Sequence, residues 1–438
     1  MRLNNHQEYL MAKSKWTDSS SVNELLSRVE KLKLKDGQLC GMIVTKKSFK
    51  SAFNSKGFDN YLMLLKELVR FDSEVPDAVK EQILHDAIWH AADMEQLQSG
   101  YIGSQIKRLE ADYLAQASKK YYLITAVSIT GIKSKRLIKT PKSVIAISRY
   151  FPRKFKQSYD FQQVHMTYPK INQKCYSWVT IEVSARCEHA ATELALEQLD
   201  YWRGIFNIFF NRNYTRTSFG KPAPINKITK YPYHSLHMEN GDKASPFYWF
   251  DPNFSYEASS LDVFKSYESA KSFYIKLSSD IEGCGSRNFF TEILNRYCVS
   301  LDTANMNSSF LAMWSLLESL TFTGKENYDV TIARTLILFK DKFHLRLELD
   351  ILRMKRNMAI HNGQQFEEAE KYAYLLMNII HEYLFFLVGA ISKSNSIEQL
   401  KSALDLPPDR AKLLKARQEL GDEIEKLDLL ENLIKIDG

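Results

Sequence analysis

The spacing of apolar positions changes several times along the chain. Over residues 22–34 and 57–118, apolar residues recur three and four positions apart, the period of one helix face. Residues 119–129 are instead rich in β-branched and aromatic side chains, which favour strands. Residues 1–119 are therefore predicted to be a mostly helical N-terminal region, with strands beginning after it.

The middle of the chain combines strand and helix patterns. Strands are predicted at residues 143–151 and 175–187, with turn and basic residues before the first of them, and helical spacing follows over 189–210. Residues 211–252 hold several prolines and glycines, which are typical of irregular connections and short edge strands. We expect residues 120–259 to form a mixed α/β domain that senses a partner or contacts RNA.

Helical spacing resumes from residue 260 and continues almost to the end. Residues 260–395 are predicted to form a helical bundle, and residues 396–438 a tail of three short helices. The apolar run Tyr374–Ile391 contains polar and charged residues, so we interpret it as a buried core helix rather than a membrane span. The predicted fold class is α+β and multidomain.

Composition fits a folded chain with more than one domain. The 438 residues exceed what one hydrophobic core usually organises, and 45% are hydrophobic and 25% charged, close to the globular average. The net charge of +7 suits a polyanionic partner but is modest for so large a surface. Five scattered cysteines without a CxxC pair, and an N-terminus without the apolar core of a signal peptide, predict a cytoplasmic protein without a membrane anchor.

One short string combines residue types that can cleave RNA. Arg356, Asn357 and His361 lie within six residues, just before Gly363, which can end a helix. Metal-free cleavage needs a base for the 2′-hydroxyl, an acid for the leaving 5′-oxygen and a cation for the developing charge. Histidine titrates near neutral pH, and arginine clamps phosphate oxygens with its planar fork. Arg356 and His361 are therefore the candidate catalytic pair.

Helix geometry places a constraint on this pair. On a continuous helix Asn357 and His361 are four residues apart and share a face, whereas Arg356 points about 140° away from His361. Either Arg356 reaches around with its long side chain, or the helix ends nearby, or a second subunit completes the site. Asn357 is expected to support the pair by orienting His361 or shaping the turn.

The string and its surroundings resemble the Apea-like branch of the HEPN family. The motif of that family is Arg, a polar residue that is often Asn, three variable residues and His. It is preceded here by an apolar helix, Ser309–Leu320, with one acidic residue, Glu318, which the resemblance marks as a supporting residue of the pocket. The apolar spacing predicts a buried face on that helix, made of Phe310, Met313, Trp314, Leu317 and Leu320.

The resemblance covers roughly Ser286–Gly389 and implies a fold and a function. It implies an all-α bundle of four or five antiparallel helices that dimerises with two motifs facing one cleft. It implies a metal-independent endoribonuclease that leaves 2′,3′-cyclic phosphate and 5′-hydroxyl ends on RNA. It also implies a toxin-like effector in bacterial anti-phage defence, whose N-terminal region either senses a trigger such as a phage component or restrains the nuclease.

Each candidate also has an ordinary structural explanation. His361 suits hydrogen bonding near a helix C-terminus, Arg356 suits a solvated helix surface, and Glu318 suits the polar edge of an amphipathic helix. Arg353 and Lys355 extend the basic character beside the motif, and they either contact RNA or belong to a solvated face.

A second basic cluster occupies residues 133–156. Cations alternate there with Tyr150, Phe151 and Phe155, which suits backbone contact plus base stacking, although a charged strand-and-turn surface explains the pattern too. The candidate RNA contacts in this cluster are Lys135, Arg136, Arg153 and Lys154.

No metal or cofactor is expected. His85 and His90, with Asp86 and Asp93, superficially resemble metal ligands, but a five-residue spacing does not align two histidines on one helix face. The usual motifs for nucleotide hydrolysis, dinucleotide binding, zinc proteolysis and α/β-hydrolase chemistry do not occur.

Three functional hypotheses follow from the sequence. The first is the endoribonuclease acting on RNA as a homodimer through its HEPN domain. The second is a non-catalytic HEPN module that binds RNA or a nucleotide, or serves as a dimerisation scaffold. The third places the function in the first 280 or so residues, with the helical part as a partner-binding tail.

Overall fold

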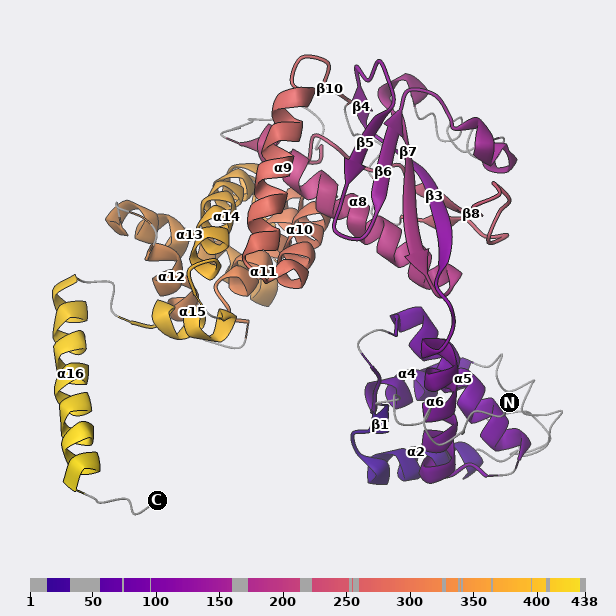
Figure 1. Ribbon diagram of the computed structural model, residues 1–438, viewed down its shortest axis with the longest axis horizontal. Coiled ribbons are helices and arrows are strands. Elements are labelled where there is room, and N and C mark those ends of the chain that lie inside the picture. The colour runs from indigo at the N-terminus through magenta and orange to yellow at the C-terminus, as the bar shows by residue number, and fades with distance from the viewer. Residues whose placement is uncertain are drawn as a thin grey trace. The chain divides into compact units, whose positions relative to one another are not determined.

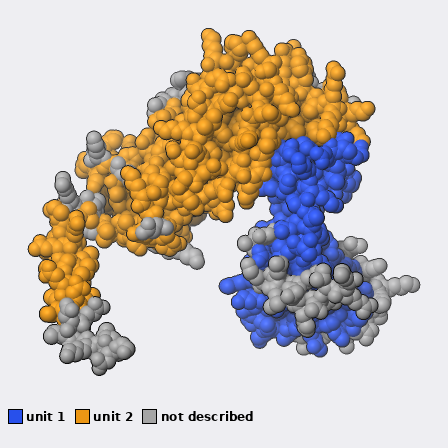
Figure 2. Space-filling model, viewed as in Figure 1, with its two compact units in different colours: residues 1–123, 181–196, 235–247 blue, residues 124–180, 197–234, 248–438 orange. Residues whose placement is uncertain are grey.

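The protein was examined as a computed structural model, which describes residues 14–31, 56–72, 75–94, 96–159, 172–212, 223–251, 254, 260–324, 328–337, 339, 342–363, 365–394, 396–406 and 410–433. The chain divides into two compact units (Figure 2). Unit 1 comprises residues 1–123, 181–196 and 235–247, and unit 2 comprises residues 124–180, 197–234 and 248–438. The fold is mixed α and β, with a central sheet and a C-terminal helical region, as the sequence predicts.

The N-terminal part of unit 1 is helical (Figure 1). Its elements are α2 (Ser19–Lys31), α4 (Lys56–Glu67), α5 (Asp77–Asp93) and α6 (Ser99–Leu114), with β1 (Lys15–Trp16) antiparallel to β2 (Val69–Arg70). Their apolar faces meet in a core that includes the fully buried Leu84 and Ile88. The buried carboxylate of Glu110 accepts hydrogen bonds from the backbone N–H groups of Ser14 and Asp72, at 2.9 and 2.7 Å. The helical character predicted for this region is confirmed for the described residues.

A six-stranded sheet has the strand order β5-β6-β7-β3-β8-β9 (Figure 1). Its strands are β3 (Lys119–Val127), β5 (Arg136–Lys139), β6 (Val144–Ser148), β7 (Ser177–Ala185), β8 (Tyr233–Met238) and β9 (Trp249–Phe250). The β5–β6 and β8–β9 pairs are antiparallel. The run Leu123–Val127 is buried throughout, as expected for a central strand covered on both faces.

Shorter elements and one long helix accompany the sheet. They are β4 (Ile129–Thr130), which pairs in parallel with β10 (Leu261–Asp262), the 3₁₀ turns η1 (Arg153–Ser158) and η2 (Gln173–Cys175), and helix α8 (Glu188–Asn211). Helix α8 matches the predicted helix at residues 189–210. Its middle is almost entirely buried, with Tyr201, Trp202 and Ile205 fully enclosed.

One expectation for this region was wrong, and another was confirmed in part. Strand β5 lies in the stretch expected to be turn and basic residues, because Ile138 points into the core while Leu137 and Lys139 on either side are exposed. The short edge strand expected near the prolines is β9, at the end of the sheet, whereas β8 lies inside the sheet between β3 and β9. Neighbouring prolines suggested an edge, but β8 itself contains none and its backbone can pair on both sides.

The C-terminal part of unit 2 is helical in its described residues. Its helices are α9 (Tyr267–Gly283), α10 (Arg287–Asp302), α11 (Met306–Leu320), α12 (Tyr328–Leu336), α13 (Lys342–Asn362), α14 (Ala369–Ile391), α15 (Ile397–Leu404) and α16 (Arg410–Leu433). Helix α11 is central, because it packs against α10, α13 and α14. The predicted buried face of α11 is confirmed: Phe310, Met313, Trp314, Leu317 and Leu320 are each at most 1% exposed.

Helices α14 and α16 bear on two further expectations. By length and composition alone α14 could cross a membrane, yet most of its apolar window is buried inside the unit, which is the pattern of a core helix.

Helix α16 is one continuous helix where two short helices were expected. Gly421 lies inside it, and a glycine within a helix costs only about 1 kcal/mol relative to alanine.

Candidate functional site

The motif occupies the last two turns of α13. This helix is continuous from Lys342 to Asn362 and therefore includes both Arg356 and His361. Gly363 follows with φ +61°, the left-handed conformation that commonly ends a helix, so the predicted helix end is confirmed. The helix does not break between Arg356 and His361.

Arg356 rests on an aromatic ring. Its guanidinium carbon lies 4.5 Å from the centre of the Tyr328 ring, at the first residue of α12, and the side chain is half-buried. Its Nη1 donates a 3.3 Å hydrogen bond to Oδ1 of Asn357. Among the described residues no carboxylate forms an ion pair with Arg356. The cation is therefore held in place by stacking while its charge stays available to an anion.

Glu318 belongs to the same aromatic cluster. Trp314 Nε1 donates a 2.7 Å hydrogen bond to Oε1 of Glu318, and the Trp314 and Tyr328 rings lie 6.3 Å apart at 70°. Glu318 is thus linked to Arg356 through two rings, and within the described chain no direct hydrogen bond joins them. The structure places these two predicted residues around one cluster on α11, α12 and α13.

His361 is exposed at the end of α13. It makes no hydrogen bond or ion pair with the described residues. Because the helix is regular, the side chains of His361 and Arg356 leave it about 140° apart, and among the described residues no hydrogen bond joins the two. Asn357 shares the face of His361 and contacts Arg356, and so lies between the two.

The basic residues beside the motif are already engaged. Arg353 forms an ion pair with Asp329 at 2.6 Å, which joins α13 to α12, and a second with Asp350 of its own helix at 3.1 Å. The Lys355 ammonium lies over the rings of Phe366 and Tyr372, at 5.6 and 5.4 Å. Both side chains stabilise packing around the motif, and their predicted RNA contacts remain predictions.

The second basic cluster is spread over β5 and η1. Arg136 stacks on Tyr267 at 4.7 Å and pairs with Glu268 at 3.0 Å, while Lys154 lies 5.7 Å from the Phe155 ring. Lys135 and Arg153 are exposed.

Of the interleaved aromatics, only Tyr150 is strongly exposed, at 74%. Phe155 is buried, and Phe151 packs edge-on against Trp178 at 4.8 Å. Phe151 and Phe155 therefore contribute more to the core than to a surface on which RNA bases stack.

The histidines of α5 do not form a metal site. His85 Nδ1 lies 3.1 Å from Asp86 Oδ1, and His90 Nδ1 lies 3.3 Å from the Tyr101 hydroxyl. Across the described ranges, no three His, Cys, Asp or Glu side chains gather closely enough to hold a metal ion.

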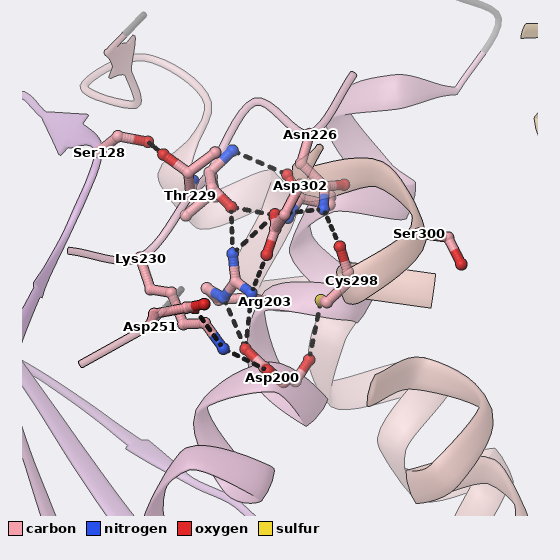
Figure 3. Close-up of polar contacts among 12 residues, drawn as sticks. Ser128, Asp200, Arg203, Asn226, Thr229, Lys230, Asp251, Cys298, Ser300 and Asp302 are labelled. Atoms are coloured by element: carbon pink, nitrogen blue, oxygen red, sulfur yellow. Dashed lines mark hydrogen bonds and ion pairs between the residues drawn. The ribbon is translucent and has the colours of Figure 1, made fainter. Parts of the chain in front are cut away.

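A buried charge network in unit 2 was missed by sequence reasoning (Figure 3). Arg203 on α8 is fully buried, and its Nη2 contacts Asp200 at 2.6 Å and Asp302 at 2.8 Å. Lys230 bridges Asp200 at 3.1 Å and Asp251 at 3.2 Å. Burial by itself would raise the pKa of Asp200, but the adjacent Arg203 and Lys230 outweigh that effect and hold the pKa below its usual range.

The network continues into the helical part of unit 2. Asn226 Nδ2 donates to Asp302 at 2.8 Å, and Asn211 Nδ2 lies 3.4 Å from Asn226 Oδ1 and 3.2 Å from the Tyr297 hydroxyl. The Tyr297 hydroxyl in turn lies 2.8 Å from His381 Nε2. Burial lowers the pKa of His381 to about 3, so this histidine is neutral. The chain of contacts ties α8 to α10 and α14.

A signal for this network was present in the sequence. Asp200, Arg203, Asn207 and Asn211 are three, four and four residues apart, which is one stripe along the otherwise apolar second half of α8, residues 199–211. A polar stripe inside a buried helix indicates partners from elsewhere in the chain, because unsatisfied buried polar groups are costly.

A separate hollow lies between α9 and α14. Its volume is about 650 Å³, and Arg212, Lys276, Phe273 and Phe385 are among the residues that line it. None of the predicted site residues lines it, so this hollow and the motif are different places. Comparison of the whole chain with protein families, with curated proteins and with solved structures finds no match.

Proposed function

We propose that the protein is a metal-independent endoribonuclease whose site is built from Arg356 and His361. The observation that carries the proposal is a guanidinium held on the Tyr328 ring, free of any described carboxylate, on the same helix end as an exposed imidazole. A stacked arginine without an acidic partner is suited to bind phosphate.

The proposed reaction balances without an added cofactor. One imidazole takes the proton of the 2′-hydroxyl, and the 2′-oxygen then attacks the adjacent phosphorus. The bond to the 5′-oxygen breaks, and a second acid protonates that leaving oxygen. Arg356 stabilises the negative charge on the phosphate oxygens. The products carry a 2′,3′-cyclic phosphate and a 5′-hydroxyl.

In this proposal, the second copy in a homodimer supplies the acid that protonates the 5′-oxygen. Since Arg356 and His361 diverge on one regular helix, a single copy presents one group or the other to a given phosphate. Two copies facing each other through the helical region would combine the arginine of one with the histidine of the other. Asn357 and the Trp314–Glu318 pair act as positioning groups for Arg356.

The proposed setting is a toxin-like effector in bacterial anti-phage defence, cytoplasmic, with the N-terminal regions responding to a phage-derived trigger. This extension depends on the family resemblance alone. If wild type and His361→Ala protected a host culture equally against a panel of phages, a nuclease-based defence role would be wrong.

The decisive experiment compares two histidines of α13. Purified protein is incubated with RNA in excess chelator, and the ends are mapped. We expect wild type to cleave RNA to cyclic-phosphate ends, and His361→Ala to lose about 10²-fold or more of the cleavage rate. His344 is an exposed histidine of the same helix, so His344→Ala is the control and should cleave like wild type. Equal cleavage by His361→Ala and wild type would reject the proposal.

The separation of Arg356 and His361 on one helix favours a second candidate function. Here Arg356 binds the phosphates of RNA or a nucleotide without chemistry, and the domain acts as a binding module or dimerisation scaffold. Binding that survives His361→Ala, disappears in Arg356→Ala and is never accompanied by cleavage would favour this function over the first.

A further inference from the structure

Helix α16 carries an uncovered apolar face. Leu413, Leu420, Ile424 and Leu427 are 38%, 59%, 57% and 62% exposed, and Ala416 lies between the first two on the same face. These five positions are three, four, four and three residues apart, so the spacing reads the same from either end, with Leu420 at its centre. Such a stripe lies along one side of a helix about 36 Å long.

The charges of α16 are polarised along its length. Among residues 411–418 the charged side chains are all basic, namely Lys412, Lys415 and Arg417. Among residues 419–429 five are acidic (Glu419, Asp422, Glu423, Glu425 and Asp428) and one, Lys426, is basic. This order opposes the helix dipole, which favours acidic residues at the start and basic residues at the end. The arrangement therefore does not serve the isolated helix.

We propose that the apolar face of α16 binds α16 of a second copy of this chain in antiparallel orientation. A twofold axis at Leu420 then pairs Leu413 with Leu427 and Ala416 with Ile424 across the interface, in both directions at once. Because the spacing is palindromic, every apolar position of the face meets an apolar position.

The same register matches the charges. With Leu420 opposite Leu420, Lys412 and Arg417 flank the apolar face at the same heights as Asp428 and Glu423 of the second copy, whereas Lys415 and Glu425 point about 140° away from that face. The basic half of each helix thereby lies along the acidic half of the other, and the helix dipoles are also antiparallel. A parallel pair would set like charges side by side along the whole length.

Two other leucines provide an internal control. Leu414 and Leu429 are 57% and 60% exposed, yet they point well away from the face defined above. Only one side of the helix has both the palindromic spacing and the matching charges.

The other possible occupant of the face is the body of the same chain. It would leave the protein monomeric, and the test below distinguishes it.

The first test measures self-association of the full chain by sedimentation over a concentration series, without RNA. A single helix pair is small compared with the ~1,600 Å² of a standard interface, so we expect association that depends on concentration. Leu420→Glu should weaken it by about tenfold or more, because it buries two unpaired carboxylates at the axis. Leu414→Glu, the matched control, should associate like wild type.

Charge reversal tests the orientation. Lys412→Glu with Arg417→Glu should weaken association, and adding Glu423→Lys with Asp428→Lys should restore it, because the two halves of the helix then attract each other again with opposite sign. In a parallel dimer the first double variant would change nothing. Far-ultraviolet circular dichroism of each variant checks that the chain remains helical.

Three results would overturn the proposal: a monomeric wild type, a dimer indifferent to Leu420→Glu, or equal weakening by Leu414→Glu. Sedimentation does not depend on RNA cleavage, so the α16 interface is tested independently of the proposed function. A dimer that survives Leu420→Glu would refute the α16 interface and leave the proposed dimer through the helical region intact.

Discussion

Two arginines of unit 2 are held in opposite ways. Arg203 is fully buried, with Asp200 and Asp302 on its guanidinium and the carbonyl of Ile228 accepting from Nη1 at 2.9 Å. Arg356 is half-buried on the Tyr328 ring, without a described carboxylate partner. The guanidinium of Arg203 therefore makes its hydrogen bonds and ion pairs inside the fold. The guanidinium of Arg356 remains open to an anion from outside the fold.

The difference shows how to distinguish a structural cation from a binding one. Burial of a charge is tolerated only when it is paired, and breaking such a pair leaves its partner uncompensated. A cation on an aromatic face loses less hydration and remains open to a phosphate. Loss of Arg203 should therefore be seen in stability, and loss of Arg356 in binding or chemistry.

The largest expected effect is on the free energy of unfolding of Arg203→Met. Removing this cation leaves Asp200 and Asp302 buried with too little positive charge, at a cost of about 3–5 kcal/mol. Arg356→Met, the matched substitution at the other arginine, should cost under about 1 kcal/mol. Urea titration followed by circular dichroism measures both. Equal destabilisation would mean that the comparison between the two arginines is wrong.

Much of the fold was predictable from local patterns in the sequence. The face of α11, the helix end at Gly363 and the helical stretch ending at Phe210 were predictable, because helical period and glycine at a helix end act over a few residues. Strand β5 was missed because it has only four residues and its two apolar residues, Leu137 and Ile138, are adjacent between two cations, so no polar–apolar alternation marks a strand. Periodicity over so short a stretch does not separate strand from turn.

The candidate site was predictable as a list of residues but not as an arrangement. Spacing alone placed Asn357 on the face of His361 and Arg356 away from it. Nothing in the string indicated that Tyr328 would support Arg356, because that contact joins two helices whose packing depends on the whole region. The partners of Arg203 were hidden for the same reason, since Asp302 is 99 residues away in sequence.

A second effect, on the pH dependence of stability, extends the comparison to histidines. Burial lowers the pKa of His381 to about 3, whereas an unfolded histidine titrates near ~6.5. Below pH 6.5 the unfolded chain therefore binds a proton that the folded chain refuses, and stability falls as pH drops toward 3. Between pH 7 and pH 5 this one residue should remove roughly 2 kcal/mol.

The matched variant for this effect is His381→Asn, which keeps a polar group beside Tyr297 without a titratable one. Its stability should fall by about 2 kcal/mol less than that of wild type over the same pH interval. His234, whose pKa burial also lowers to about 3, keeps part of the pH dependence in both proteins. Identical pH slopes for wild type and variant would show that His381 is not buried in its neutral form.

The smallest effect expected concerns the ring beneath Arg356. Tyr328→Leu keeps an apolar residue but removes the aromatic face, and a cation–π contact at a partly exposed site is worth about 0.5–1 kcal/mol. We expect RNA cleavage or, for a non-catalytic module, RNA affinity to fall about two- to fivefold, with Tyr328→Phe close to wild type. If Tyr328→Leu were as damaging as Arg356→Ala, the ring itself would take part in binding RNA. If Tyr328→Phe were equally damaging, the phenolic hydroxyl would be the important group. Only a small loss in the leucine variant and none in the phenylalanine variant fits a guanidinium that is positioned by stacking and left free to meet phosphate.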